Sequence, residues 1–159
     1  MSTLTVVNNT GNQAQFDYDI SKIFIFKNRY VAATFINLSG GTLSYAPGTL
    51  VGRVAASNKI TKCDSAATDG SQIPIGVLKS TITALVDDGE VAVNFCNSGD
   101  VVEDKLVFTG AETLATVVTV KGGAGLDVAN TNARTLGDML RSLGINIIES
   151  TENNVFDNQ

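Results

Sequence analysis

The sequence predicts a mainly β domain, a compact sandwich- or barrel-like fold with one short C-terminal helix and an extended N-terminal arm. Most of its 159 residues form short runs rich in β-branched side chains, separated by Gly, Asn, Asp and Ser. Clear helical periodicity occurs once, near the C-terminus. The first twenty residues are rich in Asn, Gln, Thr and Gly and have few apolar anchors. We therefore expect a flexible arm over 1–20 and a single domain over 21–159.

Composition excludes several classes of protein. Hydrophobic residues make up 43% of the chain and charged residues 17%, which is too apolar for a disordered chain and too weakly charged for a coiled coil. No stretch approaches the roughly 20 apolar residues of a membrane span. Met1–Thr5 lacks the basic and apolar regions of a signal peptide, so we expect a soluble protein that is made and kept inside the cell that expresses it, with no membrane partner.

The chain contains no histidine, which excludes several kinds of catalytic and metal site. Histidine is the commonest general base and the commonest zinc ligand, and without it neither a Ser-His-Asp nor a Cys-His arrangement can form. The net charge is −5, and the one basic cluster, Lys22, Lys27 and Arg29, lies beside Asp17 and Asp19. We therefore expect no nucleic-acid partner, because phosphate binding needs a strong basic surface. We also expect no cofactor and no metal.

The first half of the domain is predicted as strands joined by turns. Strands are expected at 23–26 and 30–37, with a hairpin turn at 27–29, since Asn28 tolerates the left-handed conformation. Pro47-Gly48 marks a turn before a strand at 49–54. A further short strand is expected at 59–62. The polar segment 64–72 is expected to be a loop, because Asp69-Gly70 favours a reversal.

The second half continues the pattern. Pro74 is expected at the beginning or edge of the strand 73–78, because proline cannot donate to a ladder. The strands 82–86 and 91–95 flank Asp88-Gly89, the best hairpin signal in the chain. The remaining strand candidates are 101–102, 106–108 and 114–120.

The single helix is expected near the C-terminus. Leu136, Met139, Leu140 and Leu143 recur at spacings of three and four. Thr131 or Asn132 is the predicted N-cap, and Gly144 is predicted to end the helix. A final strand is expected at 145–148.

Motifs with possible chemistry have simpler structural explanations. Gly122–Gly125 lacks the GK[ST] ending of a phosphate loop and is interpreted as a connector. Neither Asp87, Asp88 and Glu90 nor Asp100, Glu103 and Asp104 has the ligand spacing of a calcium loop, so both groups are interpreted as solvated carboxylates. Cys63 and Cys96 have no CxxC spacing, and buried free thiols are favoured over a disulfide.

Four segments carry a resemblance to a known family. They are PGTLVGRV at Pro47–Val54, DSAATDGSQIPIGVL at Asp64–Leu78, GDVV at Gly99–Val102 and LGI at Leu143–Ile145. In this order they resemble the head decoration proteins of tailed bacteriophages, the lambda type. Two departures from the family pattern are expected: residues 21–46 form additional apolar strand material where many members have only an arm, and residues 109–130 are longer than in the compact members.

The resemblance implies a β-tulip-type fold and a structural role without catalysis. Members form trimers that bind the outer surface of the expanded capsid at three-fold positions and stabilise contacts between major capsid protein subunits. It implies a homotrimer, located in the virion, with the major capsid protein as partner. The arm residues expected to bind the capsid are Thr3, Leu4, Thr5, Val6, Val7 and Phe16. The residues expected at the trimer interface are Leu43, Tyr45, Ile73, Pro74 and Ile75.

The sequence is also compatible with two other functions. Another virion component, such as a tail, fibre or head-fibre base module, could use the apolar stretch 23–36 for oligomerisation. A hydrolase with two converging carboxylates would need a deep pocket and perturbed carboxyl pKa values. No particular pair among the 16 acidic residues is indicated, so we expect no enzymatic activity.

Overall fold

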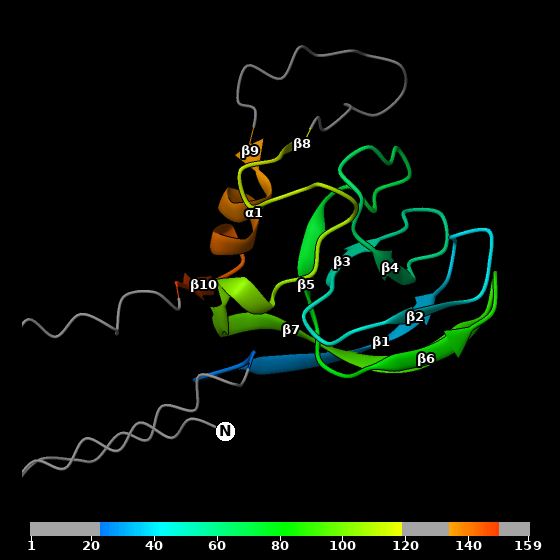
Figure 1. The fold of residues 1–159 in the computed structure, drawn as a ribbon, viewed down its shortest axis with the longest axis horizontal. Coiled ribbons are helices and arrows are strands. Elements are labelled where there is room, and N and C mark those ends of the chain that lie inside the picture. The colour runs from blue at the N-terminus through cyan, green and yellow to red at the C-terminus, as the bar shows by residue number, and fades with distance from the viewer. Residues whose placement is uncertain (1–22, 119–133, 150–159) are drawn as a thin grey trace, which may run out of the picture.

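A computed structural model describes residues 23–118 and 134–149, and its centre is a closed β-barrel (Figure 1). Neighbouring strands pair in the order β1, β4, β3, β5 and β7, and β1 also pairs with β7, which closes the ring. Closure leaves no free edge among these five strands. The predicted sandwich- or barrel-like fold is thus confirmed as a barrel. Its strands are β1 (Arg29–Ile36), β3 (Leu50–Arg53), β4 (Ile60–Lys62), β5 (Pro74–Leu78) and β7 (Glu90–Val102).

The long strand β7 extends beyond the barrel. Its second half pairs in parallel with β10 (Ile145–Ile148). On its other side it pairs with Ile23–Phe26, where Ile25 N donates to Asp100 O and Asp100 N donates to Phe26 O, each over 3.0 Å. The result is a three-stranded extension at one end of the barrel.

The turn expected at 27–29 is not a hairpin. Ile23–Phe26 and β1 lie one after the other along the same side of β7, which is long enough to pair with both. The chain is kinked between them at Lys27, which has a φ of 50° and takes the left-handed conformation expected for Asn28. Asn28 instead packs closely against Gly99. A Cβ added to Gly99 would lie only 2.6 Å from the Cα of Asn28.

A separate ribbon lies beside the barrel, formed by β2 (Leu43–Tyr45) and β6 (Ile82–Leu85). The predicted turn at Asp88-Gly89 is confirmed, since Gly89 N donates to Val86 O over 2.9 Å. The strands on either side of this turn were expected to pair with each other as a hairpin. That prediction is wrong, because β6 pairs with β2. The part of β7 that follows this turn pairs with β1 instead, from Glu90 opposite Ile36 onward.

The helix α1 (Leu136–Ser142) begins later than predicted. Its N-cap is Thr135, not Thr131 or Asn132, because the Thr135 side chain accepts from Asp138 N and the Asp138 side chain accepts from Thr135 N. Gly144 has a φ of 86° and ends the helical segment as predicted. Three short elements complete the fold: η1 (Glu103–Lys105), β8 (Val117–Val118) and β9 (Arg134–Thr135).

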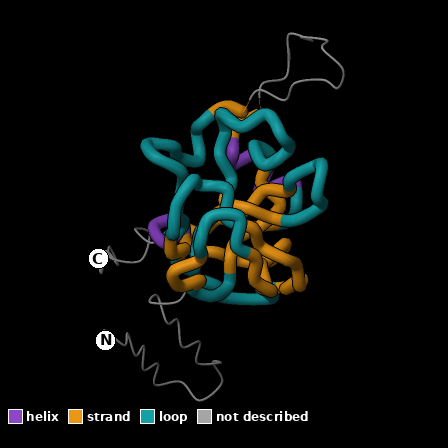
Figure 2. Tube along the Cα trace, turned by 90° about the vertical axis from the view of Figure 1, so that its right-hand side faces the viewer, coloured by secondary structure: helices purple, strands orange, loops and turns teal. Residues whose placement is uncertain are grey.

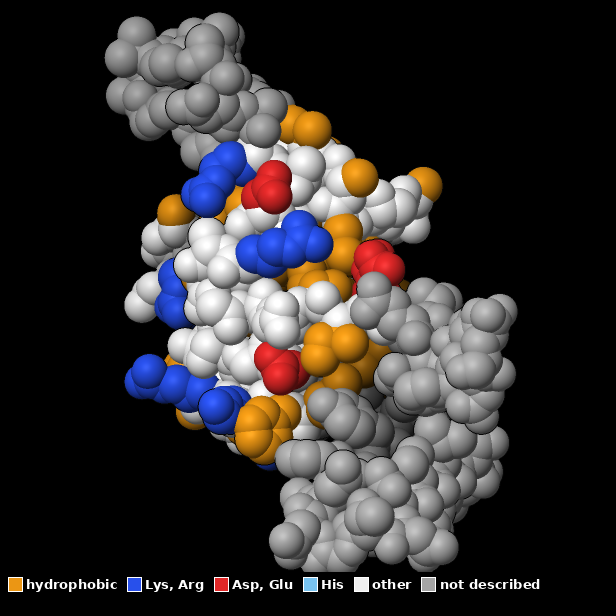
Figure 3. All heavy atoms as spheres, turned by 90° about the vertical axis from the view of Figure 1, so that its left-hand side faces the viewer, with side chains coloured by type: hydrophobic (Ala, Val, Ile, Leu, Met, Phe, Trp, Pro, Cys, Tyr) orange, Lys and Arg blue, Asp and Glu red, His pale blue; other side chains and the backbone are white. Residues whose placement is uncertain are grey.

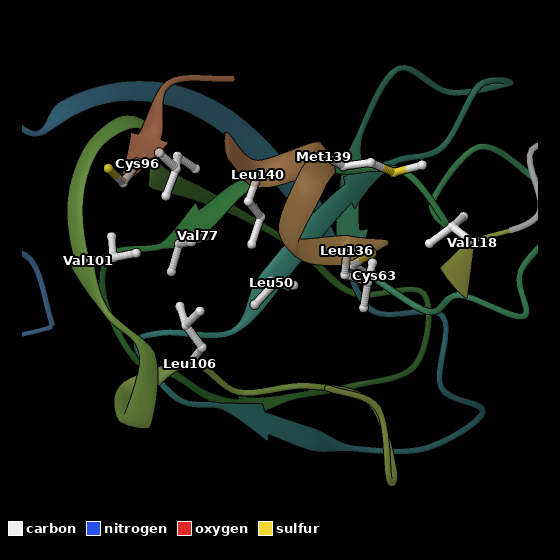
Figure 4. Close-up of a cluster of buried hydrophobic side chains, with 11 residues drawn as sticks. Leu50, Cys63, Val77, Cys96, Val101, Leu106, Val118, Leu136, Met139 and Leu140 are labelled. Atoms are coloured by element: carbon white, nitrogen blue, oxygen red, sulfur yellow. The ribbon is translucent and has the colours of Figure 1, made fainter. Parts of the chain in front are cut away.

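Two clusters of buried side chains fill the described part of the chain. The first lies in the barrel and includes Phe35, Val51, Ile60, Leu78 and Phe95. The second lies under α1, where Leu136 and Leu140 pack with Leu50 and Val77 (Figure 4). Cys63 and Cys96 belong to this second cluster as free thiols, which confirms that prediction. In Figure 2 most of the strands lie in the lower half of the molecule, and loops make up most of the upper half.

Candidate functional site

The predicted interaction residues divide into three groups. The arm residues Thr3, Leu4, Thr5, Val6, Val7 and Phe16 lie outside the described residues. Tyr45 and Pro74 are buried inside the protomer, and Ile75 packs against the barrel core. Leu43 and Ile73 are 46% and 37% exposed. Of the predicted trimer-interface residues, Leu43 and Ile73 are therefore the most available to another molecule.

The described chain begins and ends beside one residue of β7. Val102 N donates to Ile23 O over 3.0 Å, and Val102 is also the register partner of Ile148. Ile23 and Ile148, at or near the two ends of the described residues, therefore lie at the same end of the three-stranded extension (Figure 1). Figure 3 views the molecule from this side, where most of the visible Lys and Arg side chains lie toward the left border.

The beginning of β1 carries exposed aromatic and cationic side chains. Phe26 is 56% exposed and Tyr30 is 37% exposed. The Nζ of Lys27 lies 5.3 Å from the centre of the Phe26 ring, and that of Lys79 lies 4.3 Å from the centre of the Tyr30 ring. Both distances are typical of cation–π contacts. We call Phe26, Lys27, Arg29, Tyr30 and Lys79 the basic-aromatic cluster.

A groove of about 340 Å³ lies near the other end of β1. Its apolar lining comes from Leu38, Leu43 and Tyr45, at the end of β1 and in β2. Its polar lining comes from β4 and the segments packed beside it, namely Thr61, Lys62, Asp64, Asp69, Ser71 and Thr109. Leu38 is 46% exposed, as Leu43 is. We call this feature the β2–β4 groove.

Asn37 holds one rim of the groove in place and was not singled out by the sequence. It is fully buried, and its Nδ2 donates to the carbonyl oxygens of Gly41, Leu85 and Val86 over 2.7, 2.8 and 3.1 Å. Its Oδ1 accepts from Ser39 N. The sequence analysis placed Asn37 only as the last residue of the predicted strand 30–37, because its partners at Leu85 and Val86 are distant along the chain.

Asp69 contributes a carboxylate to the groove. The hydrogen bond from the Ser71 hydroxyl to Asp69 holds the pKa of that carboxyl below its usual range, so Asp69 stays ionised and makes a poor general acid. In the described ranges, no group of three or more metal-ligating side chains converges. None of the described helices is long and apolar enough to cross a membrane.

The acidic turn at the groove rim is a solvated tip, as predicted. Asp87 and Asp88 are exposed in the turn between β6 and β7. Gly40 N donates to Asp87 over 2.9 Å, which ties this turn to the loop after β1. Glu90 forms an ion pair with Lys59.

The comparisons with known proteins agree with this architecture. The sequence model described as bacteriophage lambda head decoration protein D matches residues 23–121. A search of curated proteins gives no match. The matched range runs from the strand before β1 to just beyond β8, and so includes the whole barrel, the ribbon and the groove. Because the match covers more than half of the chain, the chain belongs to the lambda-type head decoration protein family, whose members are structural proteins of the phage capsid.

Proposed function

We propose that this chain is a trimeric decoration protein that binds the outer surface of the phage capsid at three-fold positions and stabilises the shell. The family match is the observation that carries the proposal. The chain is made in the host cytoplasm and resides in the virion, with the major capsid protein as its partner. It acts by binding alone, without catalysis, nucleic acid or a membrane.

The arm over 1–20 makes the main contact with the capsid, through Thr3–Val7 and Phe16. Ile23–Phe26 supports this role because it is already paired with β7 as an extended segment. An extended peptide that adds to the edge of a sheet binds through its main chain, which tolerates the Asn, Gln and Thr side chains of the arm.

Trimerisation makes weak arms effective. Ordering a polar arm costs conformational entropy, so a single arm binds weakly. Three arms on one particle raise the effective concentration of the second and third once the first has bound. The exposed side chains of Leu43 and Ile73 support an interface between copies, because large apolar side chains on a surface favour contact with another molecule.

Deletion of Met1–Asp19 tests the arm. The truncated chain should keep the mass of a folded trimer in light scattering and should no longer sediment with expanded capsids. If the truncated trimer binds capsids as well as the full chain, the arm mechanism is wrong.

A matched pair of arm variants separates specific contacts from arm length. Replacement of Leu4, Val6 and Phe16 by Ser should weaken capsid binding strongly. Replacement of Asn8, Asn9 and Gln13 by Ser changes the same number of arm residues and should leave binding close to that of the wild type. Equal binding by both variants would assign the contact to another part of the chain.

A further inference from the structure

We infer that copies of this chain join head to tail, with the basic-aromatic cluster of one copy seated in the β2–β4 groove of the next. This inference rests on the proposed trimer and names the two surfaces that form it. It is carried by the positions of the two surfaces, their shape and apolar content, and their charge.

The two surfaces lie at opposite ends of β1. Arg29 and Tyr30 begin the strand, whereas Leu38 follows two residues after its end at Ile36. Eight residues at about 3.3 Å each separate the surfaces by roughly 26 Å, so one copy cannot fill its own groove. A contact between two different surfaces is heterologous, and such contacts produce a closed ring when the rotation between copies closes.

Apolar surface is exposed on both sides of the proposed contact. Phe26, at 56% exposed, projects from the kink at Lys27, and Leu38 and Leu43 are each 46% exposed at the groove. Aromatic side chains that enter a pocket dominate the binding energy of many interfaces. A groove of about 340 Å³ lies within the range of concave sites that bind a partner group.

The charges of the two surfaces complement each other. Within the described residues, Lys27, Arg29 and Lys79 form no ion pair with a carboxylate. The groove presents Asp64 and Asp69, which accept hydrogen bonds from their own loop and form no ion pair in the same ranges. Lys62 also lines the groove, which leaves one excess negative charge there. Opposite charge on the two surfaces favours the head-to-tail orientation over groove against groove.

The groove rim is pre-organised for binding. The hydrogen bonds of Asn37 connect the loop that carries Leu38 to the turn between β6 and β7. A rim that is already ordered loses little conformational freedom when another copy binds.

Two double variants test the pairing by light scattering. Phe26→Ser with Lys27→Ser removes side chains of the cluster, and Leu38→Ser with Leu43→Ser removes the apolar side chains of the groove. All four side chains are exposed, so both variants should fold, which circular dichroism and thermal melting check. Each variant should shift from three times 16.6 kDa to the monomer mass. Val117→Ser with Leu143→Ser changes two exposed side chains elsewhere and should remain a trimer.

Cysteine cross-linking tests the contact directly. Phe26→Cys together with Leu43→Cys in one chain should give disulfide-linked species that end at three chains after mild oxidation. Neither single variant should cross-link, because in a head-to-tail contact Phe26 does not meet Phe26 and Leu43 does not meet Leu43. The native thiols of Cys63 and Cys96 are buried and should not interfere. Phe26→Cys with Leu143→Cys is the matched control and should remain uncross-linked.

Three results would overturn the inference: a wild-type chain that is monomeric at every concentration, serine variants that stay trimeric, or cysteines at 26 and 43 that never cross-link. The proposed function is judged separately, by binding of the wild-type chain to expanded capsids. Capsid binding by a chain that lacks the cross-link would leave the decoration role standing and reject only the pairing of the two surfaces.

Discussion

The hydroxyl of Tyr45 donates a hydrogen bond to Oδ1 of Asn37 over 2.5 Å, and both side chains are buried. This contact joins the β2 ribbon to the end of β1 at the floor of the β2–β4 groove. Burial, together with the negative charge of Asp87, raises the pKa of Tyr45, although a hydrogen bond with Ser39 opposes the shift. The phenol therefore stays protonated and able to donate at neutral pH.

Removal of the Asn37 side chain should destabilise the fold more than removal of the Tyr45 hydroxyl. Asn37→Ala removes the donor to three carbonyl oxygens and should cost about 3 kcal/mol of unfolding free energy, whereas Tyr45→Phe should cost about 1 kcal/mol. Denaturant unfolding measures both. Asn94→Ala, on an exposed position of β7, is the control and should change little. Equal effects of Asn37→Ala and Asn94→Ala would contradict the role of Asn37.

Gly52 is expected to tolerate no side chain. An added Cβ would lie 2.1 Å from the carbonyl oxygen of Ser71, so the loop over β3 would have to move. Gly52→Ala should cost about 3 kcal/mol or fail to fold. Gly41→Ala meets nothing within 4 Å and should have a small effect on the melting temperature. A soluble Gly52→Ala chain with the wild-type melting temperature would show that this loop is not packed on β3.

Ala84 is strained and should be improved by glycine. Its φ of 46° lies in the left-handed region, which a Cβ disfavours by roughly 1–2 kcal/mol. Ala84→Gly should therefore raise the unfolding free energy by about 1 kcal/mol, after the entropy lost by glycine is subtracted. Ala92→Gly, at an exposed strand position without positive φ, should lower stability instead. Destabilisation by both changes would refute the strain at Ala84.

Cys63 should react slowly and should make stability depend on pH in the alkaline range. Burial, with Glu112 and Asp64 nearby, raises the pKa of its thiol from 9.0 to about 12, so at pH 8 the thiolate is roughly a thousandfold rarer than in an ordinary thiol. The unfolded chain loses this proton first, and stability should fall as the pH rises from about 9 towards 12.

Two measurements check this behaviour. Thiol labelling of the native protein at pH 8 should leave Cys63 unmodified while the unfolded chain reacts at once. Cys63→Ala removes the titrating group and should reduce the loss of stability between about pH 8 and pH 11. Rapid labelling of native Cys63 would contradict its burial in the core under α1.

Local sequence rules predicted the elements whose signals are local. Gly144 ends the helical segment, Pro74 begins β5, and Asp88-Gly89 forms the turn before β7, because each position is set by its own backbone preferences. The family resemblance was likewise carried by short local segments such as Pro47–Val54 and Gly99–Val102.

Pairings between distant segments could not be predicted in this way. The length of β7, 13 residues, decides that Ile23–Phe26 continues β1 along the same side and does not fold back on it. In the same way, β6 pairs with the distant strand β2 and not with β7, its neighbour along the chain. The groove and the basic-aromatic cluster depend on these pairings, so the sequence indicated single members of the two surfaces, such as Lys27, Arg29 and Leu43, but not the surfaces themselves.

Binding of the purified chain to expanded capsids of its own phage that lack decoration tests the central claim most directly. Sedimentation with quantified protein should show saturation at one chain for each major capsid protein subunit, since each trimer occupies a position where three capsid subunits meet. The decorated capsids should also resist heating better than bare ones. A chain that stays in the supernatant with intact, expanded capsids would contradict the decoration role.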